Sequence, residues 1–209
     1  MICNKKSNAS HIKAFLIDYW LEQNHPDLII NEVPFFKGSR RADLVIIEEN
    51  KLIGFEIKSE LDSLKNLKKQ IDDYIKIFDI VYVVIDKKFI QNKELNELPN
   101  SVGIIIYDKI IKIKKKPKQI KKFKKSNLIS LLWRKDLETL LNNKKLDFDI
   151  LQKKAQTKLP IRTIKNKILI SLKERYGTNY KYFLLDRGNY TTVEDLRIIT
   201  RINYQTFLF

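Results

Sequence analysis

The chain of 209 residues has few of the side chains that build disulfide-stabilised or zinc-binding folds: one cysteine, Cys3, and two histidines, His11 and His25. These numbers exclude a disulfide framework and a zinc site made of four Cys or His ligands. The longest apolar run, "IVYVVI", is far shorter than the roughly 20 residues of a transmembrane helix. An apolar leader near the N-terminus is also lacking. The sequence therefore predicts a cytoplasmic protein with no membrane contact.

Acidic residues are scarce in one half of the chain only. Residues 1–108 contain 15 basic and 17 acidic side chains. Residues 109–125 contain ten lysines and no acid, and residues 126–209 contain 16 basic and 8 acidic side chains. The net charge of +16 is therefore concentrated in the second half, and a general lysine bias would not have spared the first. This division predicts that the second half attracts a polyanion such as nucleic acid.

Apolar periodicity predicts a mixed α/β fold for the first half. Residues spaced at i, i+3 and i+4 predict helices over 12–20 and 64–78, the first with Ser10 as its N-cap. We expect Pro34 to end the first strand. The last two strands are rich in β-branched residues, which is typical of strands buried on both faces. The predicted strands are residues 27–36, 42–48, 51–58, 80–86 and 102–108.

The second half is predicted to be a linker followed by helices. Pro117 prevents a continuous helix in the lysine-rich segment, whereas Phe123 favours partial order there. Residues 127–143 and 160–177 are predicted helices, and Gly177 should lie just past the end of the second. The predicted domains are a mixed sheet flanked by helices over 1–108, a basic linker over 109–125 and a smaller, mainly helical domain over 126–209.

Charged residues lie within two adjacent strands in "RRADLVIIEENKLIGFEIKSE". If Glu49 and Asn50 form the turn, the numbers of paired residues add to 99, and Asp43 lies opposite Glu56. Alternation then places Arg41, Asp43, Glu56 and Lys58 on one charged face and leaves the other face apolar. Two carboxylates in direct opposition destabilise a strand pair by up to about 1 kcal/mol. The pattern therefore predicts a divalent cation between them.

Asp43, twelve residues and then Glu56-Ile57-Lys58 resemble the signature of the PD-(D/E)XK nuclease superfamily. Ala42 stands where the superfamily has its nominal proline. The whole chain, including "LLWRKDL", is also similar to a small bacterial and prophage-borne family of unassigned function.

Two further features match the RecB-type members of the superfamily. Glu32 resembles their upstream acid, and Gln70 with Tyr74 resembles their Gln-x-x-x-Tyr helix. The pattern covers approximately residues 11–107. The resemblance implies a restriction-endonuclease-like sheet and a nuclease acting on DNA, and a role in prophage biology or bacterial defence would fit.

The resemblance also implies how the site would work. Mg²⁺ or Mn²⁺ would be bound by Asp43, Glu56 and the backbone carbonyl of Ile57, because hard cations prefer oxygen ligands. Lys58 would orient the attacking water and stabilise developing charge. Glu32, Gln70 and Tyr74 complete the predicted catalytic set. The predicted nucleic-acid-binding residues are Arg41, Lys114, Lys115, Lys116, Lys121, Lys122, Lys124, Lys125, Arg162 and Lys165.

Other interpretations remain open from the sequence. Asp43 and Lys58 could form an ordinary cross-strand ion pair, and Glu32 could face solvent. Tyr74 continues an apolar helix stripe, so it could belong to the core. The whole chain could be a catalytically silent nucleic-acid-binding or adaptor protein with the same fold. The sequence leaves the oligomeric state open, including a dimer.

Overall fold

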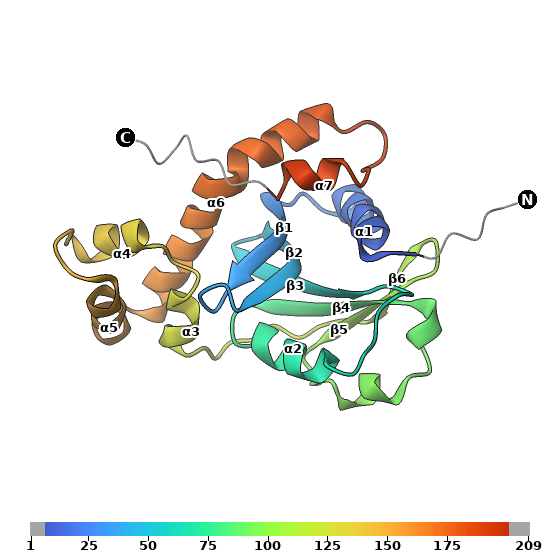
Figure 1. Ribbon diagram of the computed structural model, residues 1–209, viewed down its shortest axis with the longest axis horizontal. Coiled ribbons are helices and arrows are strands. Elements are labelled where there is room, and N and C mark those ends of the chain that lie inside the picture. The colour runs from blue at the N-terminus through green and yellow to red at the C-terminus, as the bar shows by residue number, and fades with distance from the viewer. Residues whose placement is uncertain (1–6, 201–209) are drawn as a thin grey trace, which may run out of the picture.

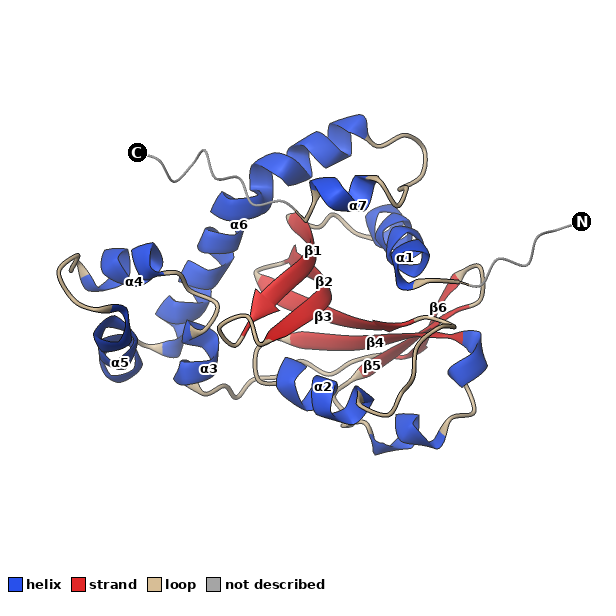
Figure 2. Ribbon diagram, viewed as in Figure 1, coloured by secondary structure: helices blue, strands red, loops and turns tan. Residues whose placement is uncertain are grey.

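The computed structural model describes residues 7–200, so Cys3 lies outside the described part. These residues form one six-stranded mixed sheet, with helices on both faces and a helical C-terminal region (Figure 1, Figure 2). The predicted fold class is thereby confirmed. The strands, in their order across the sheet, are β1 (Leu28–Phe35), β2 (Arg40–Glu48), β3 (Lys51–Lys58), β4 (Ile80–Asp86), β5 (Gly103–Tyr107) and β6 (Ile111–Lys115). β4 runs parallel to β3 and β5, and the other neighbours are antiparallel.

Helices α1 and α2 lie on opposite sides of the sheet (Figure 1). The α-helices are α1 (Ala9–Gln23), α2 (Leu67–Tyr74), α3 (Lys125–Ile129), α4 (Arg134–Leu141), α5 (Phe148–Lys158), α6 (Ile161–Asp186) and α7 (Asp195–Ile198). Two short 3₁₀ helices, η1 (Lys87–Phe89) and η2 (Lys93–Glu97), join β4 to β5. None of the helices in residues 7–200 has the length and apolar character that crossing a bilayer requires.

The sheet is buried on both faces. On the α1 side, the Trp20 ring packs edge-on against Phe55, with centroids 5.1 Å apart. On the α2 side, Phe78 covers Gly54 so closely that a Cβ at Gly54 would lie 2.6 Å from the ring. The sequence predicted one packed face and one charged face. That prediction is wrong for most of the length of the hairpin, because α2 and Phe78 cover the face that carries the charges.

The β2–β3 hairpin has the predicted register. Glu48 pairs with Lys51 and Leu44 with Phe55, so the paired numbers add to 99. Glu49 and Asn50 form the turn with φ of 48° and 60°, the left-handed conformation that two-residue hairpin loops require. The ladder ends at Leu44 and Phe55, so the two predicted pairings beyond it, Asp43 with Glu56 and Arg41 with Lys58, are absent from the ladder.

Several predicted element boundaries are wrong. The Asn8 side chain, rather than that of Ser10, caps α1 by accepting the backbone N–H of His11. Pro34 lies inside β1, which an edge strand tolerates because its unpaired side needs no N–H donor. The predicted helix over 127–143 is divided into α3 and α4. Helix α6 continues through Gly177 to Asp186, because buried Tyr180 and Phe183 extend its packed face.

Part of the predicted basic linker belongs to the sheet. β6 pairs with β5, and beyond it the backbone N–H groups of Lys118 and Ile120 donate to the carbonyls of Ser101 and Asp79. The segment thus crosses the edge of the sheet at which β4 and β5 begin. Helices α5 and α7 were not predicted.

Candidate functional site

Asp43 and Glu56 lie where β2 leaves β3. Asp43 is half-buried, and its Oδ2 accepts the backbone N–H of Ile57 at 2.7 Å. The Asp43 carboxylate therefore takes the place of the backbone carbonyl that would otherwise continue the ladder. This hydrogen bond fixes the position of the carboxylate. Glu56 is 3% exposed, and its Oε1 lies 2.9 Å from Lys58 Nζ. The ion pair therefore joins Lys58 to Glu56, not to Asp43 as the alternative reading of the sequence proposed.

Helix α2 adds two polar side chains to this cluster. Gln70 Oε1 accepts a hydrogen bond from Lys58 Nζ at 2.8 Å. The Tyr74 hydroxyl accepts the backbone N–H of Asp43 at 3.1 Å. The Tyr74 ring is buried edge-on against Phe35, with centroids 5.6 Å apart. The Tyr74 ring therefore belongs to the core, as the alternative interpretation expected, and its hydroxyl contacts the strand that carries Asp43; its catalytic role stays a prediction.

Glu32 joins the cluster through an irregularity in β1. Its φ of 61° interrupts the β1–β2 ladder between Asn31 and Val33. Its Oε1 lies 3.1 Å from Lys13 Nζ, and its Oε2 lies 2.7 Å from Arg41 Nη1. Glu32 is therefore engaged by two cations instead of facing solvent alone.

Lys13 is the functional candidate that sequence reasoning missed. It lies in α1 and is 4% exposed, although lysine is almost never fully buried without a partner. The only signal in the sequence was its place beside the buried stripe of the helix, which a surface lysine also occupies. Only the position of β1 shows that Lys13 points at a carboxylate.

The charges of the cluster shift the pKa of its acids in opposite directions. Burial, and next to it the Glu56 carboxylate, raise the pKa of Asp43 to about 7. Burial also opposes ionisation of Glu32, but Arg41 and Lys13 outweigh it and lower the pKa of Glu32. Burial and the nearby carboxylates raise the pKa of Tyr74 well above its ordinary value, so Tyr74 stays protonated.

Asp43 and Glu56 offer the carboxylate oxygens that the predicted hard cation would require, and its binding stays a prediction. Asp43 forms no ion pair with a described residue, and both burial and Glu56 oppose its charge. A divalent ion would neutralise such a pair of carboxylates. Within residues 7–200 no three or more His, Cys, Asp or Glu side chains gather to hold a metal ion. Magnesium needs only one or two carboxylates when substrate oxygens and waters complete its shell, so Asp43 and Glu56 suffice.

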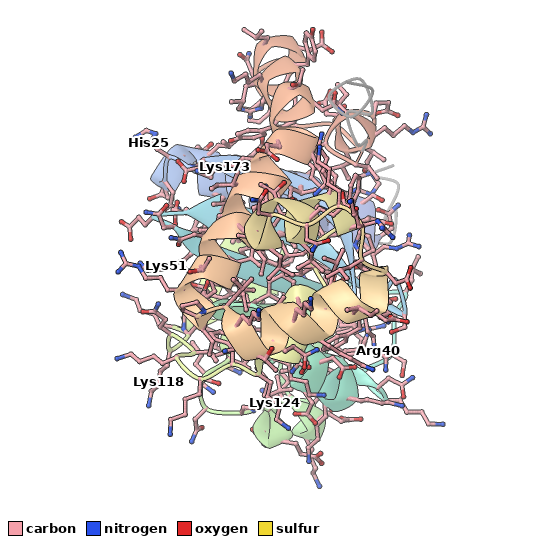
Figure 3. All side chains as sticks on the ribbon, turned by 90° about the vertical axis from the view of Figure 1, so that its left-hand side faces the viewer. His25, Arg40, Lys51, Lys118, Lys124 and Lys173 are labelled. Atoms are coloured by element: carbon pink, nitrogen blue, oxygen red, sulfur yellow. The ribbon has the colours of Figure 1, made fainter. Side chains whose placement is uncertain are left out.

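The predicted nucleic-acid-binding lysines lie apart from this cluster. None of the ten lysines of residues 109–125 forms an ion pair with an acid of the described part, and most are exposed. Figure 3 shows Lys118 and Lys124 at the lower end of a face that also presents Lys51 and Lys173. Arg162 is exposed, but Lys165 is ion-paired with buried Asp79. The charge of Lys165 is therefore neutralised within the protein by Asp79.

Fold and site together define a mixed α/β protein with a carboxylate–lysine cluster in its sheet and an unneutralised lysine segment at one edge. The chain belongs to the bacteriophage P4 protein cII family, whose pattern matches residues 3–200. It is 30% identical over 186 residues to protein cII of Enterobacteria phage P4, across 83% of this chain and 69% of that protein. The predicted similarity to a prophage-borne family is thereby confirmed.

One solved structure is also similar in part. It is a protein of unknown function from Silicibacter pomeroyi, 18% identical, with a TM-score of 0.37 over 53% of this chain and 73% of that chain. A likeness of this size supports no conclusion about function. The relation to PD-(D/E)XK nucleases stays a prediction.

Proposed function

We propose that the protein is a metal-dependent nuclease of the PD-(D/E)XK type that hydrolyses phosphodiester bonds in DNA. The supporting observation is the way four elements bring the side chains of the sequence pattern together: Glu32, Asp43, Glu56, Lys58, Gln70 and Tyr74. Lys58 contacts Glu56 and Gln70, and the Tyr74 hydroxyl contacts the Asp43 backbone. Glu32 lies opposite Asp43 in the register of β1 and β2.

The chain's own groups have separate tasks in this proposal. Asp43, Glu56 and the Ile57 carbonyl would hold Mg²⁺ or Mn²⁺, which when bound neutralises phosphate charge and helps activate water. The Lys58 ammonium orients the attacking water and stabilises charge that develops on the phosphate. Gln70 holds that ammonium in place at 2.8 Å. In this proposal Lys58 acts as a positioned cation and not as the base, since its ammonium is paired with Glu56 at 2.9 Å.

The lysine segment would bind the DNA backbone away from the cut. It contacts Asp79 at the start of β4, whereas Lys58 lies beside Ile85 near the end of that strand. The strand length between them is roughly 20 Å. One turn of B-DNA is longer, about 34 Å, so a short duplex could reach both places. Contacts of this kind add affinity without adding sequence specificity.

DNA cleavage in the presence of Mg²⁺ or Mn²⁺ tests the proposal. Asp43→Asn and Glu56→Gln should each lower the cleavage rate by at least about 100-fold, because each removes a ligand that positions charge in the transition state. Asp72→Asn is the matched control, since Asp72 lies on α2 but outside the cluster, and it should cleave like the wild type. Undiminished cleavage by Asp43→Asn or Glu56→Gln would refute the assignment.

The unneutralised lysines favour a second candidate, a nucleic-acid-binding protein without catalysis. It would bind DNA with an affinity that falls steeply with salt, by a log–log slope of about −0.9 for each phosphate contacted. Replacing Lys121, Lys122, Lys124 and Lys125 by glutamine should reduce that slope. DNA that binds but stays intact with either metal ion would favour this candidate over the nuclease.

A further inference from the structure

Lys13 and Lys58 approach the acidic cluster from different layers of the fold. Lys58 is held by Gln70 of α2, whereas Lys13 belongs to α1 on the other side of the sheet (Figure 1). Both side chains are almost fully buried. Glu32, which Lys13 contacts, lies between Asn31 and Val33, whose partners in β2 are Leu44 and Ala42, so Lys13 reaches the β1 position opposite Asp43. Two cations therefore flank the pair of carboxylates that would hold a metal ion.

The charges of this cluster cancel without any metal ion. It contains three carboxylates and three cationic side chains: Glu32, Asp43, Glu56, Lys13, Arg41 and Lys58. Both oxygens of Glu32 are engaged, one by Lys13 and one by Arg41. Only two carboxylates are left for metal ions. Because the cluster is already neutral, a first divalent ion gives it a net charge of +2 and a second would give it +4, which favours a single ion.

Two-metal nucleases use their ions to stabilise both the attacking and the leaving oxygen of the phosphate. A site with one ion needs another positive group for the second of these tasks. Lys13 is well suited to it, because its ammonium has three donors and a hydrogen bond to Glu32 is the only one that it donates to a described residue. Its burial in a water-poor site strengthens its attraction to phosphate oxygens.

We infer that Lys13 is a catalytic residue that binds the phosphate undergoing cleavage. The site would hold a single divalent ion, and Lys13 would supply the positive charge that a second ion supplies in two-metal nucleases. This inference rests on the proposed nuclease function. It assigns a role to a residue outside the sequence pattern, and it fixes the number of metal ions at one per chain.

Calorimetric titration of the wild-type protein with Mn²⁺ is the first test. We expect one ion per chain, with binding lost in Asp43→Asn. Two ions per chain would overturn the inference, and this result does not depend on whether any Lys13 variant folds. Absence of both Mn²⁺ binding and DNA cleavage in the wild type would overturn the nuclease proposal itself, and this inference with it.

Substitution of Lys13 is the second test. Lys13→Met keeps the length of the side chain and should still bind one Mn²⁺, while kcat for DNA cleavage falls about 100-fold. Lys13→Arg keeps the charge and should stay within about tenfold of the wild type. Cleavage by Lys13→Met within about threefold of an active wild type would overturn the role of Lys13 and leave the nuclease proposal standing.

Arg41→Met is the matched control for a merely structural effect. Like Lys13→Met, it removes one of the two ion pairs of Glu32. If Lys13 acted only by holding Glu32, both variants would lose activity equally, and that outcome would overturn the inference. We expect Arg41→Met, at a predicted DNA contact, to raise KM, and to lower kcat much less than Lys13→Met does, because its exposed guanidinium lies away from the reacting phosphate.

Discussion

At Asp43, burial and the neighbouring Glu56 carboxylate both oppose ionisation and raise the pKa of Asp43 to about 7. In the unfolded chain an aspartate ionises near pH 4. Above pH 7 the folded, metal-free protein therefore holds a negative charge that its surroundings disfavour. Functional sites commonly accept such a cost, because the groups that bind a ligand are not optimal for stability without it.

Asp43→Asn should make the metal-free protein more stable at pH 8, by about 1–3 kcal/mol in the free energy of unfolding. The amide oxygen can still accept the Ile57 N–H, so the charge is the main change. The advantage should fade between pH 7 and pH 4, where the wild-type carboxyl takes up a proton in the folded state. Urea unfolding at pH 8 and pH 5 measures both effects, with Asp72→Asn as control. Equal stability at pH 8 would contradict the expectation.

At the scale of elements, the β2–β3 hairpin determines where Asp43 and Glu56 meet. Its turn contains Glu49 and Asn50, both with positive φ, a conformation that few residues other than glycine, asparagine and aspartate adopt easily. Two-residue turns of this kind favour the sequence Asn-Gly. The packing of Gly54 under Phe78 therefore helps a suboptimal turn to hold the register.

Glu49→Asn combined with Asn50→Gly should stabilise the protein by about 0.5–1.5 kcal/mol, because these residues adopt the left-handed conformation with less strain. The exposed ion pair of Glu49 with Lys51 contributes little, so its loss should not cancel the gain. Thermal unfolding measures the change. Gly54→Ala should act in the opposite direction, with a loss of about 1–3 kcal/mol, because its Cβ would meet the Phe78 ring at 2.6 Å. A destabilised turn variant would show that this conformation is not under strain.

At the scale of the whole molecule, the second half of the chain completes the first. Strand β6 covers the edge of β5, and α6 packs on β1. Asp18 of α1 accepts hydrogen bonds from Arg187 and from the backbone and side chain of Thr191. Asp79, at the start of β4, is joined to Lys165 of α6. The buried apolar side chains of both halves form one continuous core.

A fragment of residues 1–108 should therefore fail to fold cooperatively. It would lose an edge strand, the helix on β1 and the partners of two buried or half-buried aspartates, each a source of several kcal/mol. Circular dichroism during thermal unfolding measures cooperativity. A fragment of residues 1–200, which keeps every described contact, is the control and should unfold cooperatively. A sharp transition for residues 1–108 would support the predicted domain boundary.

The amino-acid sequence by itself determined the type and order of the main elements, because strands and helices have different local periodicities. The turn at Glu49 and Asn50 set the hairpin register, and with it the placement of Asp43 near Glu56. Chain spacing also placed Gln70 and Tyr74 on one face of α2, since residues four apart are neighbours on a helix. These relations are local, so they can be read from the sequence.

Only the tertiary structure decided which of these side chains meet and what surrounds them. Lys13 reaches Glu32 because α1 packs across the sheet, and no local pattern encodes that contact. Helix α6 passes Gly177, and the lysine-rich segment supplies β6, because long-range packing and strand pairing outweigh local preference. The burial of the acidic cluster has the same origin. Residues distant in the chain exclude water from the cluster, and this burial shifts the pKa of its acids.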